Sequence, residues 1–522
     1  MSLAAALAIL ALVLVLPSHP ADLTPAGMFG QLPAELPLLV PALAALPARG
    51  LRLAVTGMLW LMVVLKLADI AGQAAFLRPF DPILDRNLIG AGWTLLAGAI
   101  GLPRATAVLA AAVAALFLLA AALWWATGRI TAAGRGRRGL AAAGLVAGTG
   151  LAFAGLLPGT PATTRLAVAH ARSLQAARAD LAAFRREAAR DPWTGARLAG
   201  LQGRDAALIF VESYGRTALE APDAAPVVRP VLAKAEAALA ARGLALRSGW
   251  LTSPIAGGQS WLAHATLLSG LRIDSEARYR ALIASPRRTL PALAAEAGWD
   301  TAAVVPAITR AWPEARYFGY GTVLDAGTLG YRGLPFGWVT MPDQYTLAAL
   351  ERLLAARERP VFATAALISS HAPWTPLPRL LPWEAIGDGA VYDAAETAGE
   401  DPDSLWRDPA RVRQNYAAAL AYSLAASLEA LGRDGAPALA VVLGDHQPAP
   451  FVAAGVGGRD VPVHVIGAPA LVDRLADWGW TPGLLPDPAL PAWPMAAFRD
   501  RFLAAFAEPA PLPGALPPAS PH

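Results

Sequence analysis

The chain has no cysteine among its 522 residues. This absence excludes disulfide bonds, thiol nucleophiles and zinc sites built on cysteine. Charge is also scarce, because only 16% of the residues are Asp, Glu, Lys or Arg, and lysine is rare. The formal net charge of +4 is small for this length and gives no indication of a nucleic-acid partner.

Apolar residues are in excess and make up 55% of the chain. They are concentrated before about residue 160, whereas Asp, Glu, Arg and His become common after it. A positive mean hydropathy with this uneven distribution is unusual for a soluble enzyme. The sequence therefore predicts a membrane domain over residues 1–160 and a water-soluble part after it.

Five apolar stretches in the first part are candidate membrane helices: Leu3–Leu16, Leu36–Leu46, Leu53–Ile70, Ala105–Ala126 and Leu140–Leu157. A span needs roughly 20 residues. The last three stretches meet this need best, whereas the first two are short and the second contains Pro37 and Pro41. A cleaved signal peptide is the alternative for the first stretch, which lacks a basic n-region and an A-x-A site. We predict about five spans.

Arginine placement predicts the orientation of these spans. With the N-terminus inside, the connection holding Arg49 and Arg52 and the Arg129–Arg138 loop both fall on the cytoplasmic side. This satisfies the positive-inside rule and puts everything after the fifth helix outside. The expected location is the bacterial cytoplasmic (inner) membrane, crossed several times, with a periplasmic or extracellular C-terminal domain.

Charged residues also occur within or beside the apolar stretches. Lys66 and Asp69 lie three apart near the outer end of the third stretch, which favours an interfacial ion pair. A contact to a lipid headgroup is the alternative. Asp81, Asp85 and Arg86 precede an amphipathic or re-entrant stretch.

The remaining chain divides into a joining helix, a folded domain and a tail. Residues 163–190 have apolar residues at helical spacing with basic ones between them, and Pro192 follows. This pattern predicts an amphipathic surface helix within a joining segment, residues 161–203. Residues 509–522 are rich in proline and are expected to be disordered.

Residues 204–508 alternate short apolar runs with amphipathic helical patterns. The runs ALIFVE, TAAVVP, VFATAALI, ALAVVLG and VPVHVIG predict buried strands. Helices such as PVLAKAEAALAARG and AALERLLAARE lie between them. The alternation predicts an α/β domain with a mostly parallel sheet covered by helices on both faces.

Polar residues follow three of these predicted strands. Glu212 ends the first, Asp445 and His446 follow a late one, and His371 follows a middle one. Ligands of such sheets bind beyond the carboxyl ends of the strands. Two carboxylates and an imidazole at neighbouring strand ends predict a divalent metal site.

A hydroxyl group completes this set of polar residues. Ser260 follows the Gly257–Gly258 turn and stands at the expected start of a helix. Backbone N–H groups there can hold a phosphate, and a bound metal would lower the pKa of the hydroxyl and make it a nucleophile. Simple helix capping by Ser260 is the alternative.

The motif order resembles a known superfamily. VES, GGQSW, SSHAPW and GDH are weak separately, but in this order they look like the alkaline phosphatase/sulfatase superfamily. Five spans, a joining helix and an external domain are similar to lipoteichoic acid synthases and osmoregulated-glucan phosphoglycerol transferases. The resemblance covers nearly the whole chain and implies a sulfatase-like catalytic domain over residues 204–508.

The resemblance implies roles for individual residues. Glu212, Ser260, Asp445 and His446 would bind one divalent metal, Mn²⁺ first, with Zn²⁺ or Mg²⁺ as alternatives. Ser260 would also be the catalytic nucleophile. His371 would contact the substrate phosphate or the departing group.

Further substrate-binding candidates come from the segment TRAWPEARYFGY, which resembles a Trp/Arg phosphate-binding segment with shorter spacing. They are Arg310, Trp312 and Arg316, although Trp312 covering the core is an alternative. His464 is a further candidate for lining the site. His264, one helical turn after the hydroxyl, either lines the pocket or packs inside.

The implied function is transfer of phosphoglycerol from the donor phosphatidylglycerol, through a Ser-linked intermediate, to a glycan or polyol acceptor outside the membrane. Two departures weaken the details, because the synthases carry Thr where Ser260 stands and no Cys-x-Pro-x-Arg sulfatase motif occurs. Phosphoethanolamine transferases usually carry disulfides in the external domain, and this chain can form none. Phosphoethanolamine transfer is therefore the alternative rather than the first interpretation. Phosphodiester or sulfate ester hydrolysis is a further alternative. A silent membrane sensor is the non-enzyme alternative.

Overall fold

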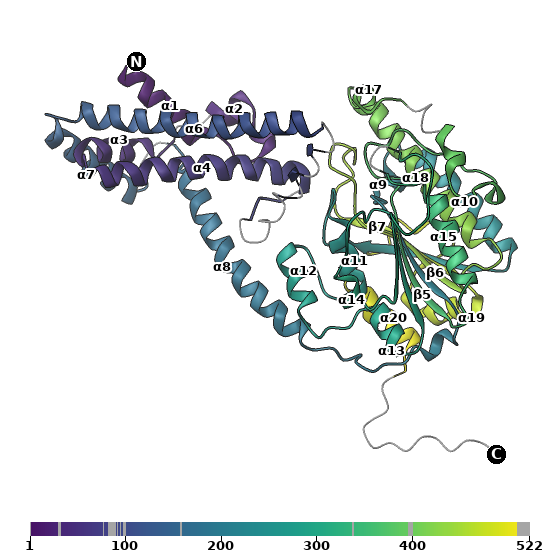
Figure 1. The fold of residues 1–522 in the computed structure, drawn as a ribbon. Helices are drawn as coiled ribbons and strands as arrows, with labels where there is room; N and C mark the ends of the chain where they lie inside the picture. Colours follow the sequence, from purple (N-terminus) through teal and green to yellow (C-terminus); the bar gives the residue numbers. More distant parts are fainter. Residues whose placement is uncertain are drawn as a thin grey trace. The chain divides into compact units, whose positions relative to one another are not determined.

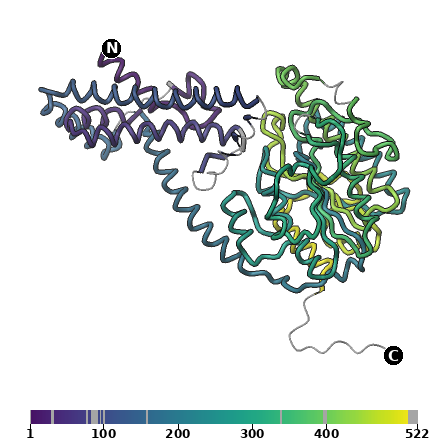
Figure 2. The backbone as a smooth tube through the Cα atoms, viewed as in Figure 1, coloured from purple at the N-terminus to yellow at the C-terminus, as the bar shows by residue number. Residues whose placement is uncertain are grey.

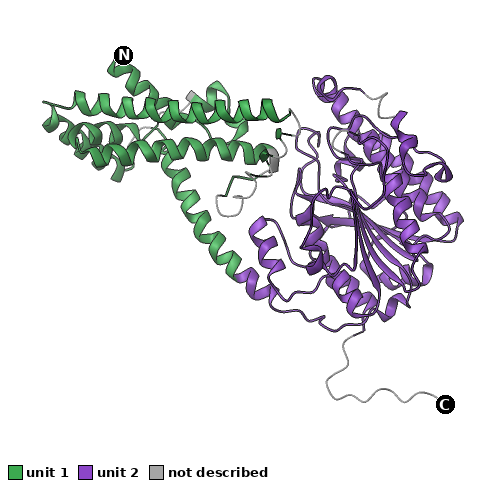
Figure 3. Ribbon diagram, in the orientation of Figure 1, with its two compact units in different colours: residues 1–182 green, residues 183–522 purple. Residues whose placement is uncertain are grey.

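The computed structural model describes residues 2–29, 33–76, 78–81, 90, 92–93, 96–97, 101–156, 159–336, 339–394 and 400–508. Our expectations for Asp85, for Arg86 and for the proline-rich tail lie outside these ranges. The chain divides into two compact units, residues 1–182 and residues 183–522, which Figure 3 colours separately.

The first unit is helical (Figure 1). Its α-helices are α1 (Leu3–Val15), α2 (Pro25–Phe29), α3 (Leu36–Ala45), α4 (Arg49–Phe76), α6 (Leu102–Ala133), α7 (Arg138–Phe153) and most of α8 (Ala162–Ala188). Two described helices are long and apolar enough to cross a membrane, α4 over Arg49–Ala74 and α6. The shorter apolar helices α1, α3 and α7 coincide with our remaining predicted spans. The region therefore has two candidate spans, and the count of five stays a prediction.

The predicted ion pair between Lys66 and Asp69 is wrong. Both side chains are buried, but Lys66 Nζ donates to the carbonyl oxygens of Val13 (3.2 Å) and Leu14 (2.9 Å) and to Thr163 Oγ1 (3.0 Å). The carbonyls at a helix C-terminus lack partners within the helix, and a cation there is favourable. Lys66 therefore caps the end of α1.

Asp69 has partners of its own. Its Oδ2 lies 3.0 Å from His170 Nε2 on α8, and its Oδ1 accepts a hydrogen bond from the backbone N–H of Phe80 (3.0 Å). The contact between Asp69 and His170 therefore ties α8 to α4 inside the first unit.

The second unit contains a nine-stranded sheet with the order β4-β3-β5-β1-β6-β7-β2-β8, and β9 pairs with β2. Its strands are β1 (Ala206–Val211), β2 (Ala245–Thr252), β3 (Asp300–Val305), β4 (Thr322–Asp325), β5 (Val361–Leu367), β6 (Leu439–Gly444), β7 (Asp460–Gly467), β8 (Thr481–Pro482) and β9 (Trp493–Pro494). Figure 2 shows that strands from distant parts of the chain lie side by side.

The sheet is mixed, although mostly parallel. Neighbours from β4 to β6 pair in parallel, whereas β7 is antiparallel to both β6 and β2. The five predicted strands are present. The exception to the parallel order is β7, which runs back beside β6 after the connection formed by residues 445–459.

Helices cover both faces of this sheet. Along β1, Ala207, Ile209 and Val211 pack into one apolar core, and Ala206, Leu208 and Phe210 into the other. Successive strand side chains point to opposite faces, which explains why β1 is apolar at every position. The first face is covered by α10 (Ala225–Ala241), α15 (Asp343–Ala355) and α18 (Pro409–Leu431), and the second by α11 (Ser260–Ser269), α13 (Leu290–Glu296) and α20 (Ala497–Phe506).

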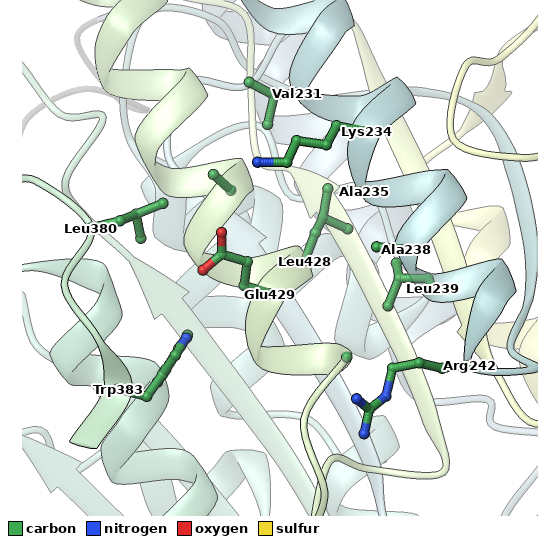
Figure 4. Close-up of a pocket in the computed structure, with 12 residues that line it drawn as sticks. Val231, Lys234, Ala235, Ala238, Leu239, Arg242, Leu380, Trp383, Leu428 and Glu429 are labelled. Atoms are coloured by element: carbon green, nitrogen blue, oxygen red, sulfur yellow. The ribbon is translucent and has the colours of Figure 1, made fainter.

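Short helices complete the second unit: α9 (Thr217–Glu220), α12 (Glu276–Ile283), α14 (Ala315–Phe318), α17 (Pro402–Leu405) and α19 (Pro469–Val472). A surface groove of about 480 Å³ lies between α10 and α18 (Figure 4). Lys234, Trp383 and Glu429 line it. This groove is on the face opposite α11 and contains none of the polar residues that we expected at the strand ends.

The orientation of the first unit can be tested with reporter fusions. We expect a fusion after Arg138 to report the cytoplasm and a fusion after Gly203 to report the outside, because the arginine-rich loop stays inside. An alkaline-phosphatase-type reporter would be read together with a cytoplasmic reporter at each position. If both fusions report the same side, the predicted orientation is wrong.

Candidate active site

Two carboxylates stand side by side because β1 and β6 are parallel neighbours. Val211 pairs with Gly444 at the ends of these strands, so that Glu212 and Asp445 follow at matching positions. Both carboxylates are buried. Only glycine fits at position 444, since an added Cβ would stand 1.8 Å from the carbonyl oxygen of Tyr214.

Ser260 reaches these carboxylates from α11. The helix begins at Ser260, after Gln259 in the left-handed region (φ +67°). The turn before it is tied down by a hydrogen bond from the Gly257 N–H to the carbonyl of Gln447 (2.9 Å). Ser260 Oγ donates to Glu212 Oε2 (2.8 Å) and lies 3.2 Å from His446 Nε2.

We expected Ser260 at the N-cap, with helix capping as its alternative role. The N-cap residue is instead Gln259, and Ser260 is the first helical residue. The hydroxyl makes its hydrogen bonds with side chains of the site and not with the backbone of its own helix. Capping therefore does not account for this serine.

Hydrogen bonds fix the orientation of Asp445. Its Oδ1 accepts from the backbone N–H groups of Ser213 (2.8 Å) and His446 (2.7 Å). Ser213 has a positive φ of 56°, which is uncommon for residues other than glycine. Its hydroxyl donates to Glu212 Oε1 (3.0 Å), and its carbonyl accepts from Tyr416 (2.9 Å). Strained backbone held by this many contacts is typical of functional sites.

The site concentrates negative charge. Burial raises the pKa of Asp445, and the charge of Glu212 raises it further. Burial opposes the charged form of Glu212, yet the nearby His446 holds the pKa of that carboxyl far below its usual value. The two carboxylates raise the pKa of His446 to about 9, although burial alone would lower it. Such a group favours a bound cation.

The donor atoms fit a divalent metal. One ligand atom from each of Glu212, Asp445 and His446 lies within 4.8 Å of the others. His446 Nδ1 donates to the carbonyl of Gln447 (2.8 Å), because a carbonyl can only accept. This fixes the ring so that Nε2 faces the carboxylates, as in metal-binding histidines with an outer hydrogen bond. Two carboxylates and one imidazole suit a hard-to-borderline divalent ion.

Of the predicted substrate-binding residues, His371 is near the site and the arginines are not fixed there. His371 follows β5, and its charge would help to lower the pKa of Glu212. Arg310 and Arg316 are exposed to solvent. Trp312 is half-buried and packs on Phe318, with ring centres 5.8 Å apart. These substrate contacts remain predictions.

The structure does not support the substrate contact that we expected for His464. The side chain is fully buried in β7, and both ring nitrogens have partners. Ser248 Oγ donates to the carbonyl of Gly483 (2.6 Å), so it accepts from His464 Nδ1 (2.7 Å), and Tyr214 OH donates to Nε2 (2.9 Å). Burial lowers the pKa of His464 to about 3, and the neutral ring is a structural element.

Sequence reasoning missed four residues that hold the site. They are Ser213, Ser370, Tyr416 and Gln447. Ser370 Oγ donates to the carbonyl of Glu212 (2.7 Å), which fixes the end of β1. Ser213, Ser370 and Gln447 are each next in sequence to a predicted site residue, so their positions within these motifs could have indicated them. Tyr416 lies within α18 and gave no signal.

No protein-family profile and no curated protein sequence matches the chain. Its fold is similar to several solved structures, among them the lipoteichoic acid synthase LtaP from Listeria monocytogenes (14% identity, 50% of this chain and 65% of that chain, TM-score 0.35). A second is a protein in the alkaline phosphatase superfamily from Vibrio parahaemolyticus (16% identity, 51% and 60%, TM-score 0.34).

A third similar structure is the lipooligosaccharide phosphoethanolamine transferase A, EptA, from Neisseria meningitidis, an integral membrane protein (14% identity, 86% of this chain and 84% of that chain, TM-score 0.40). The chain spans less than two thirds of the Listeria and Vibrio structures.

Removing one carboxylate should remove metal binding while sparing the apo protein. In Asp445→Asn, the amide oxygen can still accept from the two backbone N–H groups, and repulsion with Glu212 disappears. Because the pKa of Asp445 is raised in the folded state, its ionised form costs stability at about pH 7. The variant without metal should therefore unfold at the same or a higher temperature than the wild type.

Added Mn²⁺ or Zn²⁺ should raise the unfolding temperature of the wild type but not that of Asp445→Asn, with about 2.7 kcal/mol of stabilisation of the wild type at 100 times Kd. Thermal unfolding and metal analysis of the full chain in detergent measure both effects. Asp300→Asn is the control, because Asp300 begins β3 and therefore lies at the amino ends of the parallel strands. The metal ligands lie at the carboxyl ends. Unchanged metal stabilisation of Asp445→Asn would exclude Asp445 as a ligand.

Proposed function

We propose that the chain is a metal-dependent transferase that moves phosphoglycerol from phosphatidylglycerol to a glycan or polyol acceptor outside the cytoplasmic membrane. The observation that carries this proposal is the position of Ser260. Its hydroxyl opens α11, donates to a buried carboxylate and lies beside the imidazole of His446. A hydroxyl in such surroundings is a nucleophile rather than a structural group.

Glu212, Asp445 and His446 would hold a divalent metal, with Ser260 as a further ligand. Mn²⁺ is our first choice, because carboxylate and hydroxyl oxygens dominate this set, and Zn²⁺ or Mg²⁺ are the alternatives. When bound, the metal would lower the pKa of the Ser260 hydroxyl and offset negative charge on the phosphate.

The reaction proceeds in two displacements at phosphorus. In the first, Ser260 Oγ bonds to the phosphorus, its proton leaves toward the Glu212 side, and the phosphorus–oxygen bond to diacylglycerol breaks. Diacylglycerol leaves when its oxygen takes up that proton. In the second, an acceptor hydroxyl bonds to the phosphorus, its proton leaves toward the same side, and the bond to Ser260 Oγ breaks. Ser260 Oγ takes up this proton, and the acceptor keeps the phosphoglycerol group.

The beginning of α11 supports the same chemistry. The first N–H groups of an α-helix have no partner within the helix and point toward its N-terminus, where they favour an anion. Ser260 is the first residue of this helix. A phosphate oxygen beside Ser260 would accept from these donors as negative charge develops.

The membrane unit supports a lipid donor. The two candidate spans, α4 and α6, would hold the chain in the bilayer where phospholipids are concentrated. Holding enzyme and donor in one membrane lowers the entropic cost of bringing them together. Phosphatidylethanolamine is the alternative donor, since the same two displacements would move its headgroup. Comparing diacylglycerol release from the two lipids distinguishes these donors.

Ser260→Ala should reduce turnover by on the order of three decades or more, because the nucleophile is lost. Binding of the lipid should persist, and Ser260→Thr should keep some activity because it retains a hydroxyl. Diacylglycerol release measures turnover. Mass spectrometry of the wild type trapped with phosphatidylglycerol should show a glycerophosphoryl adduct on the peptide that contains Ser260.

Ser269→Ala is the matched control, because Ser269 ends the same helix about two and a half turns away. It should keep activity close to that of the wild type. An adduct on another residue, or near-normal turnover of Ser260→Ala, would contradict the assignment of the nucleophile.

A further inference from the structure

A small cavity lies beside the helix that carries Ser260. It has a volume of about 50 Å³ and is lined mainly by aromatic rings, among them Trp261, Tyr279, Trp312 and Tyr320. Its floor includes Phe210 of β1, two residues before Glu212. Residues two apart in a strand point to the same face of the sheet, so the cavity and the Glu212 side chain share the face that α11 covers.

One polar atom beside this cavity has no partner. His264 lines the cavity, and its ring packs on Phe210 with centres 4.0 Å apart. His264 Nε2 is buried and makes no hydrogen bond. A buried polar nitrogen without a partner destabilises the folded protein, so such atoms are rare unless a ligand or a water satisfies them.

The position of His264 connects the cavity to the nucleophile. His264 is four residues after Ser260 in the same helix, and residues four apart lie on one helix face. At a rise of 1.5 Å per residue, the two positions are about 6 Å apart along the axis. A group bound to phosphorus at Ser260 and extended by three carbons can span this separation.

The lining of the cavity favours a neutral polar group. Among its described lining residues, no side chain is acidic, and His264 is the only one with a basic side chain. Burial lowers the pKa of His264 to about 4, so the ring is neutral at about pH 7 and can exchange a hydrogen bond with a hydroxyl. An ammonium group would be desolvated there without a carboxylate to pair with.

We propose that this aromatic cavity is the subsite for the free end of the transferred headgroup, with His264 Nε2 hydrogen-bonded to a hydroxyl of its glycerol. This inference rests on the proposed function and assigns His264 a role in donor specificity. Trp261 is 40% exposed and forms a wall of the cavity, so the subsite has one side open to an entering headgroup. The aromatic rings would pack against the carbon chain of the glycerol.

The test compares two donors that differ only in the hydroxyls, phosphatidylglycerol and phosphatidylpropanol with the same acyl chains. The ratio of their kcat/KM values, measured by diacylglycerol release, should fall about tenfold or more in His264→Leu, because the hydrogen bond to the headgroup is lost. His264→Gln should retain part of the ratio, since its amide can replace the ring nitrogen. Unfolding temperature and metal content confirm that each variant is folded.

Leu268→Val is the matched control, because it removes one methylene from the same cavity without changing a polar atom. It should lower kcat/KM for both donors alike and leave their ratio unchanged. An unchanged ratio in both His264 variants would overturn the inference and identify His264 as a packing residue that holds a buried water. A preference for phosphatidylethanolamine that His264→Leu removes would overturn the hydroxyl assignment in favour of an ammonium.

A binding measurement separates this inference from the proposed function. Calorimetry with glycerol phosphate and propyl phosphate needs no turnover and can be done on Ser260→Ala. Glycerol phosphate should bind more tightly, and His264→Leu in that background should remove the difference. If the wild type releases no diacylglycerol from any phospholipid but this difference is found, the transfer reaction is wrong and the subsite stands. Equal binding of the two phosphates refutes the subsite.

Discussion

The parallel pairing of β1 with β6 is the constraint on which the site depends. It sets Glu212 beside Asp445 at the carboxyl edge of the sheet, both of them buried. Two buried carboxylates this close cannot both stay ionised without a positive charge nearby. Hydrogen bonds from backbone N–H groups orient Asp445, but they do not remove the repulsion. The fold therefore holds two repelling carboxylates together, and a bound cation would offset this repulsion.

His446 and Ser260 both interact with these carboxylates. Without a metal, the carboxylates favour a proton on His446, whose pKa is raised to about 9. A metal would take the place of that proton, since Nδ1 is already committed to the Gln447 carbonyl and Nε2 faces the carboxylates. Ser260 is delivered to the same point from α11. The negative charge of the two carboxylates and the position of α11 thus both act on the hydroxyl of Ser260.

Much of this arrangement could be predicted from the sequence. The apolar runs locate the five central strands, and polar residues that directly follow two of them predict Glu212 and Asp445 as neighbours. Local patterns do not encode strand direction, so the antiparallel course of β7 and the burial of His464 were not foreseen. The predicted ion pair between Lys66 and Asp69 is wrong for a related reason. Their spacing along one helix allowed an ion pair, but partners from distant segments compete for each of them.

The two faces of the second unit differ in what they offer a substrate. On the α10–α18 face, Lys234 and Glu429 line an open groove, and none of the described residues that line this groove has a buried side-chain polar atom without a partner. On the α11 face, an unpartnered nitrogen of His264 stands one helical turn from the nucleophile. An unsatisfied group costs stability in the free protein, and a ligand that satisfies it recovers that cost on binding. Selectivity for the headgroup would then come from the same face as the chemistry, because one helix carries both groups.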